Sequence, residues 1–543
     1  MLKFGSNSAL RRFKLLAVKH MMGIKMFNRE SILAMTTACF CFGVTAAQAE
    51  VVTLRSLDAN TTMTGTIIGF DGEMYQLKTT FGTILLDAAL VSCEGADCPD
   101  LMADLSEYSI TGSNSIGVQM MPAIIEAYAY ALGGDLEVEA VTPAQFKYTI
   151  TDADGEMYSV ITVNLGDSGD AFEALENREA SIGLSTRRVT TGERNRFLRA
   201  GKGDLTTPAQ ERILALDGLV VTVSPDNAIR TLSLDQISNI FAGNIRNWRD
   251  VGGIDASINV YRRDGNSGAT QVFENLVMAP TRRVLANTAF ILGSNAAVSD
   301  AVAQDPNGIG ITSASAERNA KVLSLRSACG QVSTPSEFSI KTEEYPISGR
   351  MFLYTTSGAI PNKATEFIEF ATSDAAQEIV EHVGFVSQNV ATASLNDQGR
   401  RLAHALTSEH DRASLELLQE MVAGLLEAER LSLTFRFKSE SILPDNRALL
   451  DIARVADMLK NGDFDGKRLM IIGFSDSLGA INENQRLSQA RAESIRDALV
   501  EAVGGDAGNV QFTPIGYGKL SPIGCNETEG GRDTNRRVEI WVR

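Results

Sequence analysis

The stretch Tyr108-Ser109-Ile110-Thr111-Gly112-Ser113-Asn114-Ser115 begins the part of the chain that decides the fold. In it, a short strand-like run passes through a glycine turn into a long helical pattern. Further buried-strand patterns follow at 180–184, 219–223 and 258–261, with helical stretches between them. Because strands alternate with helices, we predict an α/β fold over residues 105–390.

The size and charge of the chain exclude several classes of protein. Its 543 residues correspond to three or four domains at the usual domain size. A hydrophobic share of 44% and a charged share of 22% are typical of a globular protein and argue against disorder. The net charge of −17 does not suit a nucleic-acid-binding protein, which needs a basic face, and it disfavours attachment to anionic lipid.

Residues 1–49 have the features of an export signal. Seven basic residues and one acid precede or flank an apolar run, which ends in Ala47-Gln48-Ala49. This order is typical of a secretory signal peptide cleaved after Ala49, and the apolar run is too short to span a membrane as a helix. Because the basic region is unusually long, translation starting at Met26 is an alternative.

Three further segments complete the predicted organisation. Residues 50–104 contain short β-prone runs and are predicted to form a small β domain for packing or interaction. Residues 391–430 are predicted to be a helical linker, because Leu415, Leu418, Val422, Leu425 and Leu426 recur at helical spacing. This linker could be a spacer or could pack on a neighbouring domain. Residues 431–543 have the pattern of a compact βαβ-type domain.

The cysteines agree with an oxidising compartment. Cys93 and Cys98 flank a turn-like stretch, and we expect a disulfide between them. Two cysteines without a nearby histidine make a poor metal site, so no metal is expected. Cys329 and Cys525 are far apart in the sequence and are interpreted as solitary, buried apolar residues.

Four polar turns in the central region could bind an anion. Gly112-Ser113-Asn114-Ser115 and Gly166-Asp167-Ser168-Gly169 each precede a helical stretch, whose exposed N–H groups and dipole favour negative charge. Ser185 and Thr186 follow a strand. The fourth turn runs from Arg263 to Ser267-Gly268. The guanidinium of Arg263 could donate hydrogen bonds to two oxygens of an anion there. The alternatives are that the serines only cap helices and that Arg263 pairs with a neighbouring acid such as Asp264.

Longer stretches of this region are distinctive. They include Leu234-Asp235-Gln236-Ile237-Ser238-Asn239-Ile240-Phe241-Ala242-Gly243-Asn244-Ile245-Arg246-Asn247-Trp248 and Arg263-Asp264-Gly265-Asn266-Ser267-Gly268. In these stretches residues 106–390 resemble the phosphate-binding proteins of bacterial ABC importers. The resemblance implies a two-lobed periplasmic binding protein fold that holds phosphate or a similar oxyanion, with the importer's membrane subunits as partner. It implies a site made by Ser113, Ser115, Ser168, Ser185, Arg263, Ser267 and Gly268, and we add Thr186 as a further candidate because it follows Ser185.

Two positions depart from that family. Many members carry an acid after the serine that corresponds to Ser185, where it can accept a proton from hydrogen phosphate, but this chain has Thr186. Ala269 stands where a threonine is frequent. Another tetrahedral oxyanion is therefore an open alternative.

The last domain carries a possible zwitterion pocket. Asp476 follows a buried-strand pattern at 468–474, and Arg491 lies fifteen residues later on a predicted helix. An acid and an arginine are complementary to the ammonium and carboxylate of an amino acid, although they could also form a purely structural ion pair.

With the ending Gly516-Tyr517-Gly518 and Asn535-Arg536-Arg537, these residues resemble the OmpA-like peptidoglycan-binding domain. The resemblance implies noncovalent binding of peptidoglycan, at the diaminopimelate of its stem peptide, in the periplasm of a Gram-negative bacterium, with association to the cell wall or outer membrane. It implies a site made by Asp476, Asn484, Leu487, Arg491, Asn535 and Arg536.

We find no HExxH, G-x-S-x-G or P-loop motif in the sequence, so we predict a non-enzyme without a cofactor. The predicted fold class is α/β multidomain, with a two-lobed periplasmic binding protein fold, a small β domain before it and an OmpA-like βαβ domain after it. Two functions fit: an oxyanion receptor tethered to peptidoglycan, or a cell-envelope scaffold whose binding domain does not serve transport.

Overall fold

The computed structural model describes residues 51–56, 61–70, 74–87, 91–95, 98, 106–265, 267–358, 360–408, 412–437, 441–442, 444–505 and 507–543. The predicted signal peptide, 1–49, lies outside these residues. Within the described part, no helix is both long and apolar enough to cross a membrane. The chain divides into two compact units, Met1–Pro99 and Asp100–Arg543.

The first unit contains one antiparallel sheet of five strands in the order β4-β3-β2-β1-β5. Val52, Leu54, Tyr75 and Leu77 form its small core. Cys93 and Cys98 form a disulfide with their Cα atoms 5.8 Å apart. The strands are β1 (Val52–Ser56), β2 (Thr62–Phe70), β3 (Met74–Thr79), β4 (Gly82–Asp87) and β5 (Val91–Glu94).

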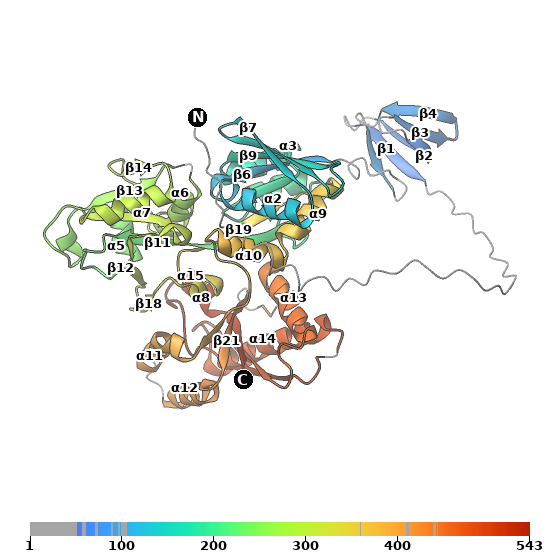
Figure 1. The fold of residues 1–543 in the computed structure, drawn as a ribbon. Helices are drawn as coiled ribbons and strands as arrows, with labels where there is room; N and C mark the ends of the chain where they lie inside the picture. The colour runs from blue at the N-terminus through green and yellow to red at the C-terminus, as the bar shows by residue number, and fades with distance from the viewer. Residues whose placement is uncertain are drawn as a thin grey trace. The chain divides into compact units, whose positions relative to one another are not determined.

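The second unit begins with residues 106–390, which we call the binding domain after the family that their sequence resembles. They are built on a large sheet in the order β14-β13-β15-β11-β19-β10-β6-β9-β8-β7. The long strand β11 (Glu211–Val223) pairs with β15 (Gly308–Ser313) on one side and with β19 (Ser348–Tyr354) on the other. Two lobes therefore share β11 and β19 (Figure 1). This arrangement confirms the predicted α/β fold class.

The first lobe contains the strands around β6 and the helices that follow them. Ile110, Ile124 and Val163 belong to its buried apolar cluster. The long helical pattern after Ser115 is in fact two helices, α1 and α2, separated at 118–119. The elements are β6 (Glu107–Ser113), β7 (Leu136–Thr142), β8 (Gln145–Thr151), β9 (Met157–Gly166), β10 (Ile182–Ser185), α1 (Asn114–Gly117), α2 (Met120–Ala131), α3 (Ser168–Asn177), α4 (Thr191–Arg199), α9 (Asn362–Ala371) and α10 (Asp374–His382).

The second lobe contains the strands around β13 and a separate three-stranded sheet in the order β12-β17-β18. Ile240, Phe273 and Ile309 lie in its buried cluster. The elements are β12 (Thr231–Ser233), β13 (Asn259–Arg263), β14 (Phe290–Leu292), β16 (Lys321–Val322), β17 (Ser324–Arg326), β18 (Val332–Ser333), α5 (Leu234–Phe241), α6 (Gly268–Phe273), α7 (Asn295–Gln304) and α8 (Glu337–Lys341).

The C-terminal domain is a five-stranded sheet in the order β20-β21-β24-β22-β23, with helices packed on it. The predicted strand at 468–474 is β22, and the predicted helix that carries Arg491 is α14. The elements are β20 (Thr392–Ser394), β21 (Glu429–Arg436), β22 (Arg468–Gly473), β23 (Gln511–Gly516), β24 (Arg537–Val542), α11 (Gly399–Ser408), α12 (Arg412–Leu425), α13 (Asn446–Lys460), α14 (Ile481–Ala502) and α15 (Glu529–Asn535).

The segment 391–430 packs on this sheet. β20 pairs with β21 in antiparallel register, Thr392 opposite Leu431. Leu402 and Leu418, from α11 and α12, share a buried cluster with Trp541 of β24. Of the two alternatives for this segment, the structure therefore has the packed one.

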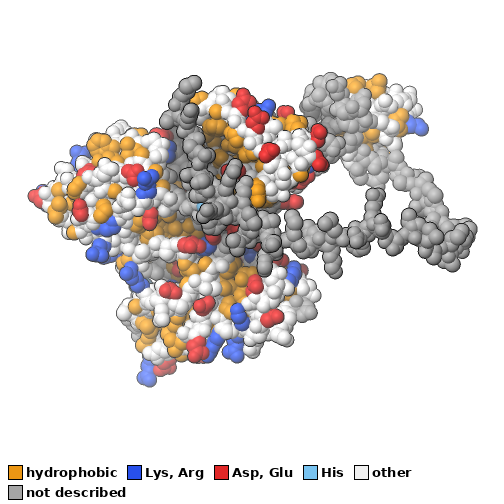
Figure 2. Space-filling model, viewed as in Figure 1, with side chains coloured by type: hydrophobic (Ala, Val, Ile, Leu, Met, Phe, Trp, Pro, Cys, Tyr) orange, Lys and Arg blue, Asp and Glu red, His pale blue; other side chains and the backbone are white. Residues whose placement is uncertain are grey.

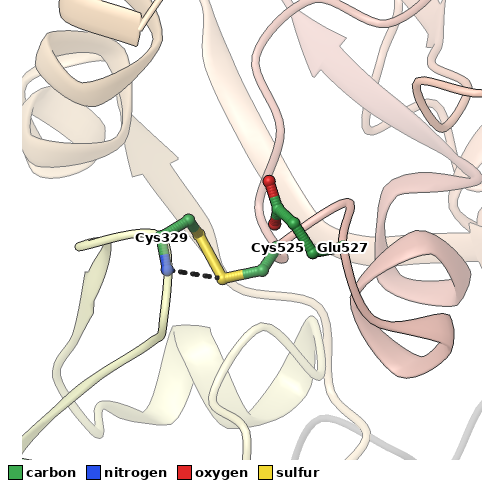
Figure 3. A group of neighbouring side chains, drawn as sticks. All are labelled: Cys329, Cys525 and Glu527. Atoms are coloured by element: carbon green, nitrogen blue, oxygen red, sulfur yellow. Dashed lines mark hydrogen bonds between the residues drawn. A yellow bond between two sulfur atoms is a disulfide. The ribbon is translucent and has the colours of Figure 1, made fainter.

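Cys329 and Cys525 are not solitary, so that interpretation is wrong. They form a disulfide between the β17–β18 hairpin of the second lobe and the loop after β23 (Figure 3). The sequence could not indicate this pair, because 196 residues separate the two cysteines. Glu527 lies beside them in a group whose possible ligand atoms are within 4.8 Å, but two sulfurs bonded to each other offer no thiolate to a metal.

A largely buried ion cluster lies at the C-terminal sheet. The Glu539 carboxylate lies 2.8 Å from Arg401, 3.3 Å from Arg430 and 2.7 Å from Arg537. Burial alone would raise the pKa of Glu539, but these guanidinium groups hold that pKa well below its usual range. Arg430 also reaches Glu344 of the binding domain at 2.5 Å, so the cluster joins the two domains.

We predict that Glu539→Gln destabilises the protein by about 3–5 kcal/mol, because it leaves buried guanidinium charges without compensation. Urea unfolding followed by tryptophan fluorescence measures this, since the Trp541 indole N–H donates to Glu539 at 3.0 Å. The matched control is Glu501→Gln, at an exposed position on α14. Equal unfolding midpoints for the two variants would contradict the prediction.

Candidate functional site

Residues from four separate segments meet between the two lobes. A Cβ placed on Gly268, the first residue of α6, would lie 2.6 Å from the Ser115 hydroxyl oxygen and 3.2 Å from that of Thr186. Ser168 lies beside Thr186, with 3.2 Å between their hydroxyl oxygens. Because α6 belongs to the second lobe and the other three residues to the first, the absence of a side chain at Gly268 lets the lobes approach closely.

Of the remaining predicted serines, Ser267 and Ser185 have local hydrogen bonds. The Ser267 hydroxyl caps α6 by accepting from the Thr270 N–H at 3.2 Å. Ser185 donates to the Arg187 carbonyl at 2.6 Å and accepts from its N–H at 3.2 Å. Ser113 is buried at the start of α1 and makes no side-chain cap hydrogen bond. For Ser267, the capping alternative is therefore observed.

Arg263 ends β13 beside the turn that leads into α6. Its carbonyl accepts from the Thr270 hydroxyl at 3.1 Å, which ties the strand end to the helix. Its guanidinium lies 3.8 Å from the Asp264 carboxylate, which is too long for a hydrogen bond. The Nε atom is buried and has no hydrogen-bond partner among the described residues. Leaving such a donor unpaired costs about 1–3 kcal/mol, so the atom marks a place where an anion would be stabilised.

The two arginines that follow Thr186 are already paired. Arg187 makes two hydrogen bonds with Glu193, at 2.9 and 2.7 Å. Arg188 makes two with Glu211, at 2.9 and 2.5 Å. In each of these bidentate pairs, both oxygens of the carboxylate accept a hydrogen bond from the arginine. Arg263 is therefore the better candidate for contact with an anionic ligand.

A small cavity lies where the lobes meet. Its volume is about 20 Å³, close to the space that one water molecule needs. Ser115, Thr186 and Gly268 line it, while Ser113, Ser168, Ser185, Arg263 and Ser267 are not among its lining residues. The lobes thus lie close against each other around this cavity.

Sequence reasoning missed two polar residues that line this cavity, Asp217 and Asn295. The Asn295 side-chain oxygen is buried without a partner in the described part of the chain. Asp217 accepts from the Ser313 hydroxyl at 2.7 Å and from the Gly218 N–H at 2.8 Å. Burial raises the pKa of Asp217 to about 7. Its position as the single acid in the apolar run 213–221 was the signal in the sequence.

In the C-terminal domain, Asp476 pairs with Arg536. The distance from the Asp476 carboxylate to the Arg536 guanidinium is 2.7 Å, and the other Asp476 oxygen accepts from the Leu478 N–H at 3.0 Å. Arg491 is fully buried on α14 and donates to the Ser441 carbonyl at 3.0 Å. Its pKa is lowered to about 10 by burial and by Arg536, against the opposing effect of Asp476. The three charges therefore interact, but the direct partner of Asp476 is Arg536.

The other predicted residues of this pocket shape the backbone around it. Asn484 donates to the Leu478 carbonyl at 2.8 Å, which holds the turn after Asp476. The Asn535 side chain accepts from the N–H groups of Ile523 and Gly524 at 2.7 and 2.9 Å. Leu487 is half-buried on α14.

We predict that Asp217→Asn changes how stability depends on pH. Because the pKa of Asp217 is raised from about 3.8 to about 7, the carboxyl group stabilises the folded state fully below pH 4, and this contribution is lost as the pH rises through 7. Asparagine does not titrate, so the melting temperature of the variant relative to wild type should increase from pH 4 to pH 8. Melting curves across this range test it. The exposed Asp250→Asn is the control, and the same pH trend in both variants would contradict the prediction.

Two family descriptions match the chain. Residues 147–375 match the PBP superfamily domain, and residues 434–536 match the OmpA family. Among solved structures, an ABC-type phosphate transport receptor from Vibrio cholerae is 23% identical, with a TM-score of 0.41, covering 51% of this chain and 99% of that one.

Named relatives divide between the same two regions. The phosphate-binding protein PstS of Borreliella burgdorferi is 27% identical over 42% of this chain and 79% of its own length. Outer membrane porin F of Pseudomonas aeruginosa is 34% identical over 22% of this chain and 33% of its own length, so the chain matches about a third of that porin. The peptidoglycan-binding protein ArfA of Mycobacterium tuberculosis is 39% identical over 19% of this chain and 29% of its own length. The chain therefore has a region similar to the PBP superfamily domain, followed by a C-terminal region similar to the OmpA family.

Proposed function

We propose that the protein is an exported receptor for phosphate or a similar tetrahedral oxyanion, tethered noncovalently to peptidoglycan by its C-terminal domain. The observation that carries the proposal is the meeting of Ser115, Ser168, Thr186 and Gly268 at the contact of the two lobes. The buried, unpaired Nε of Arg263 and the similarity to proteins named phosphate-binding support it.

Binding in this proposal is an induced closure. With the lobes apart, the anion enters between the hydroxyl groups of the first lobe and the start of α6. The lobes then rotate about β11 and β19, the strands that they share, and close on the anion. Arg263 donates to the oxygens from β13, and each hydrogen bond to the charged ligand contributes about 1.5–3 kcal/mol.

Asp217 affects which form of the anion is bound. An ionised Asp217 carboxylate beside the cavity repels a fully deprotonated anion. If either the carboxylate or the anion carries a proton, that proton forms a hydrogen bond between them. An oxyanion that carries a proton near pH 7, such as phosphate, fits this environment better than sulfate does.

The proposed cell-wall pocket holds the amino-acid end of diaminopimelate. Asp476 receives the ammonium group, and Arg491 faces the carboxylate. Asp476 then exchanges part of its contact with Arg536 for contact with the ligand. The similarity of this domain to a protein named peptidoglycan-binding supports the assignment.

In this function the protein resides in the periplasm of a Gram-negative bacterium, attached to the cell wall or outer membrane. It passes its anion to the membrane subunits of an ABC importer. The second candidate is an envelope scaffold whose binding domain does not serve transport. Thr186 favours this candidate, because no carboxylate follows Ser185 to accept a proton from hydrogen phosphate.

Calorimetric titration of the mature protein with phosphate, sulfate and arsenate separates the two candidates. We predict micromolar or tighter phosphate binding, and an increase in its dissociation constant of at least about 30-fold, or about 2 kcal/mol, in Arg263→Ala. The control is Arg249→Ala, an exposed arginine in the same lobe. Absence of heat with all three anions would favour the scaffold, and unchanged affinity in Arg263→Ala would remove this residue from the site.

For the cell-wall pocket, we predict that Asp476→Asn weakens cosedimentation with isolated peptidoglycan at least tenfold, because the ligand ammonium loses its charged partner. Asp497→Asn, at an exposed position on α14, should bind like wild type. Melting curves check that Asp476→Asn remains folded after losing its ion pair with Arg536. Equal cosedimentation of the two variants would contradict the assignment.

A further inference from the structure

The disulfide between Cys329 and Cys525 connects the two proposed binding sites. Cys329 lies in the β17–β18 hairpin, and its N–H donates to the Cys525 sulfur at 3.2 Å (Figure 3). Nearby, the Gln331 side chain donates to the Pro522 carbonyl at 3.4 Å. This hairpin and this loop are therefore held together by one covalent bond and two hydrogen bonds.

On one side of the disulfide, the hairpin belongs to the lobe that carries Gly268. β17 pairs with β12 in parallel register, Thr231 opposite Ser324. The segment just before it, β16, pairs with β11 at Thr222 and Val223. Because of these pairings, Cys329 must move with the second lobe when the cleft opens or closes.

On the other side, the residues next to Cys525 hold the Asp476 turn. The Asn526 side-chain oxygen accepts from the Ser477 N–H at 3.1 Å and from the Asn535 amide at 2.9 Å. Arg536, which follows Asn535, is the ion-pair partner of Asp476. A displacement of Cys525 would therefore shift the backbone after Asp476, and it would also shift the Arg536 guanidinium that Asp476 contacts.

The C-terminal domain is also held at the strands that the lobes share. Glu343, in the turn between α8 and β19, lies 2.5 Å from Arg350 of β19 and 2.8 Å from Arg447 of α13. Arg350 also faces Asp445 at 3.4 Å. Since the domain is attached both at β19 and at the second lobe, rotation of that lobe strains the loop around Cys525.

We propose that anion binding in the cleft and peptidoglycan binding at the Asp476 pocket are coupled through the Cys329–Cys525 disulfide. The inference rests on the proposed function and adds to it anion-dependent attachment to the cell wall. The structure combines closed lobes with an intact Asp476 turn, and in this proposal opening of the lobes disturbs that turn. An anion that stabilises the closed state thus strengthens attachment, and attachment strengthens anion binding by the same factor.

The experiment uses the mature full chain and two probes, inorganic phosphate and a fluorescent soluble muropeptide that contains diaminopimelate. Anisotropy gives the muropeptide dissociation constant with and without saturating phosphate, and calorimetry gives the phosphate constant with and without muropeptide. We expect each ligand to tighten the other at least about fivefold, by equal factors. In the double variant Cys329→Ser/Cys525→Ser the factor should fall to one, while both ligands still bind.

The matched control is Cys93→Ser/Cys98→Ser, which removes a disulfide of the first unit and should keep the full factor. Two outcomes overturn the inference but leave the proposed function: both ligands bind wild type independently, or the Cys329→Ser/Cys525→Ser variant keeps the coupling. Failure of wild type to bind phosphate removes the proposed receptor function and the inference together. If the cysteine variant does not fold, the coupling factor is measured in the Cys93→Ser/Cys98→Ser chain before and after reduction with dithiothreitol, and an unchanged factor after reduction overturns the inference.

Discussion

Strand β11 is the element on which the binding domain depends. Its pairing with β15 and with β19 gives the two lobes a common backbone, so the closure that we propose would be a rotation about these strands. That constraint brings Gly268 against Ser115 and Thr186 from distant parts of the sequence. It also places Asp217, near the middle of β11, at the cavity between the lobes.

The charge of the protein and the charge of its proposed ligand are compatible. The net charge is −17, and acidic and basic side chains are interspersed on the face shown in Figure 2. At physiological salt, charges beyond about 8 Å are largely screened, so recognition depends on the groups that touch the anion. Arg187 and Arg188 are neutralised by their own glutamates, whereas the Nε of Arg263 remains unpaired within the described residues.

Covalent and ionic contacts fix the interface between the binding domain and the C-terminal domain. It combines the Cys329–Cys525 disulfide with the ion pairs of Glu343 and Glu344. Buried ion pairs of this kind contribute little net stability, but breaking one is costly, so they specify a single arrangement of the two domains. A flexible tether would need neither feature, which is why we connect the interface to communication between the sites.

The sequence by itself determined the α/β alternation, the C-terminal strands and helices, and the resemblance of both domains to their families, because these follow from local periodicity and contiguous motifs. It also predicted the turns that carry Ser115, Thr186 and Gly268. Only the tertiary structure decided that Asp476 pairs with Arg536, that Asp217 and Asn295 line the cavity, and that Cys329 joins Cys525. Each of these depends on which distant segments lie side by side, and neither spacing nor residue type along one chain encodes that proximity.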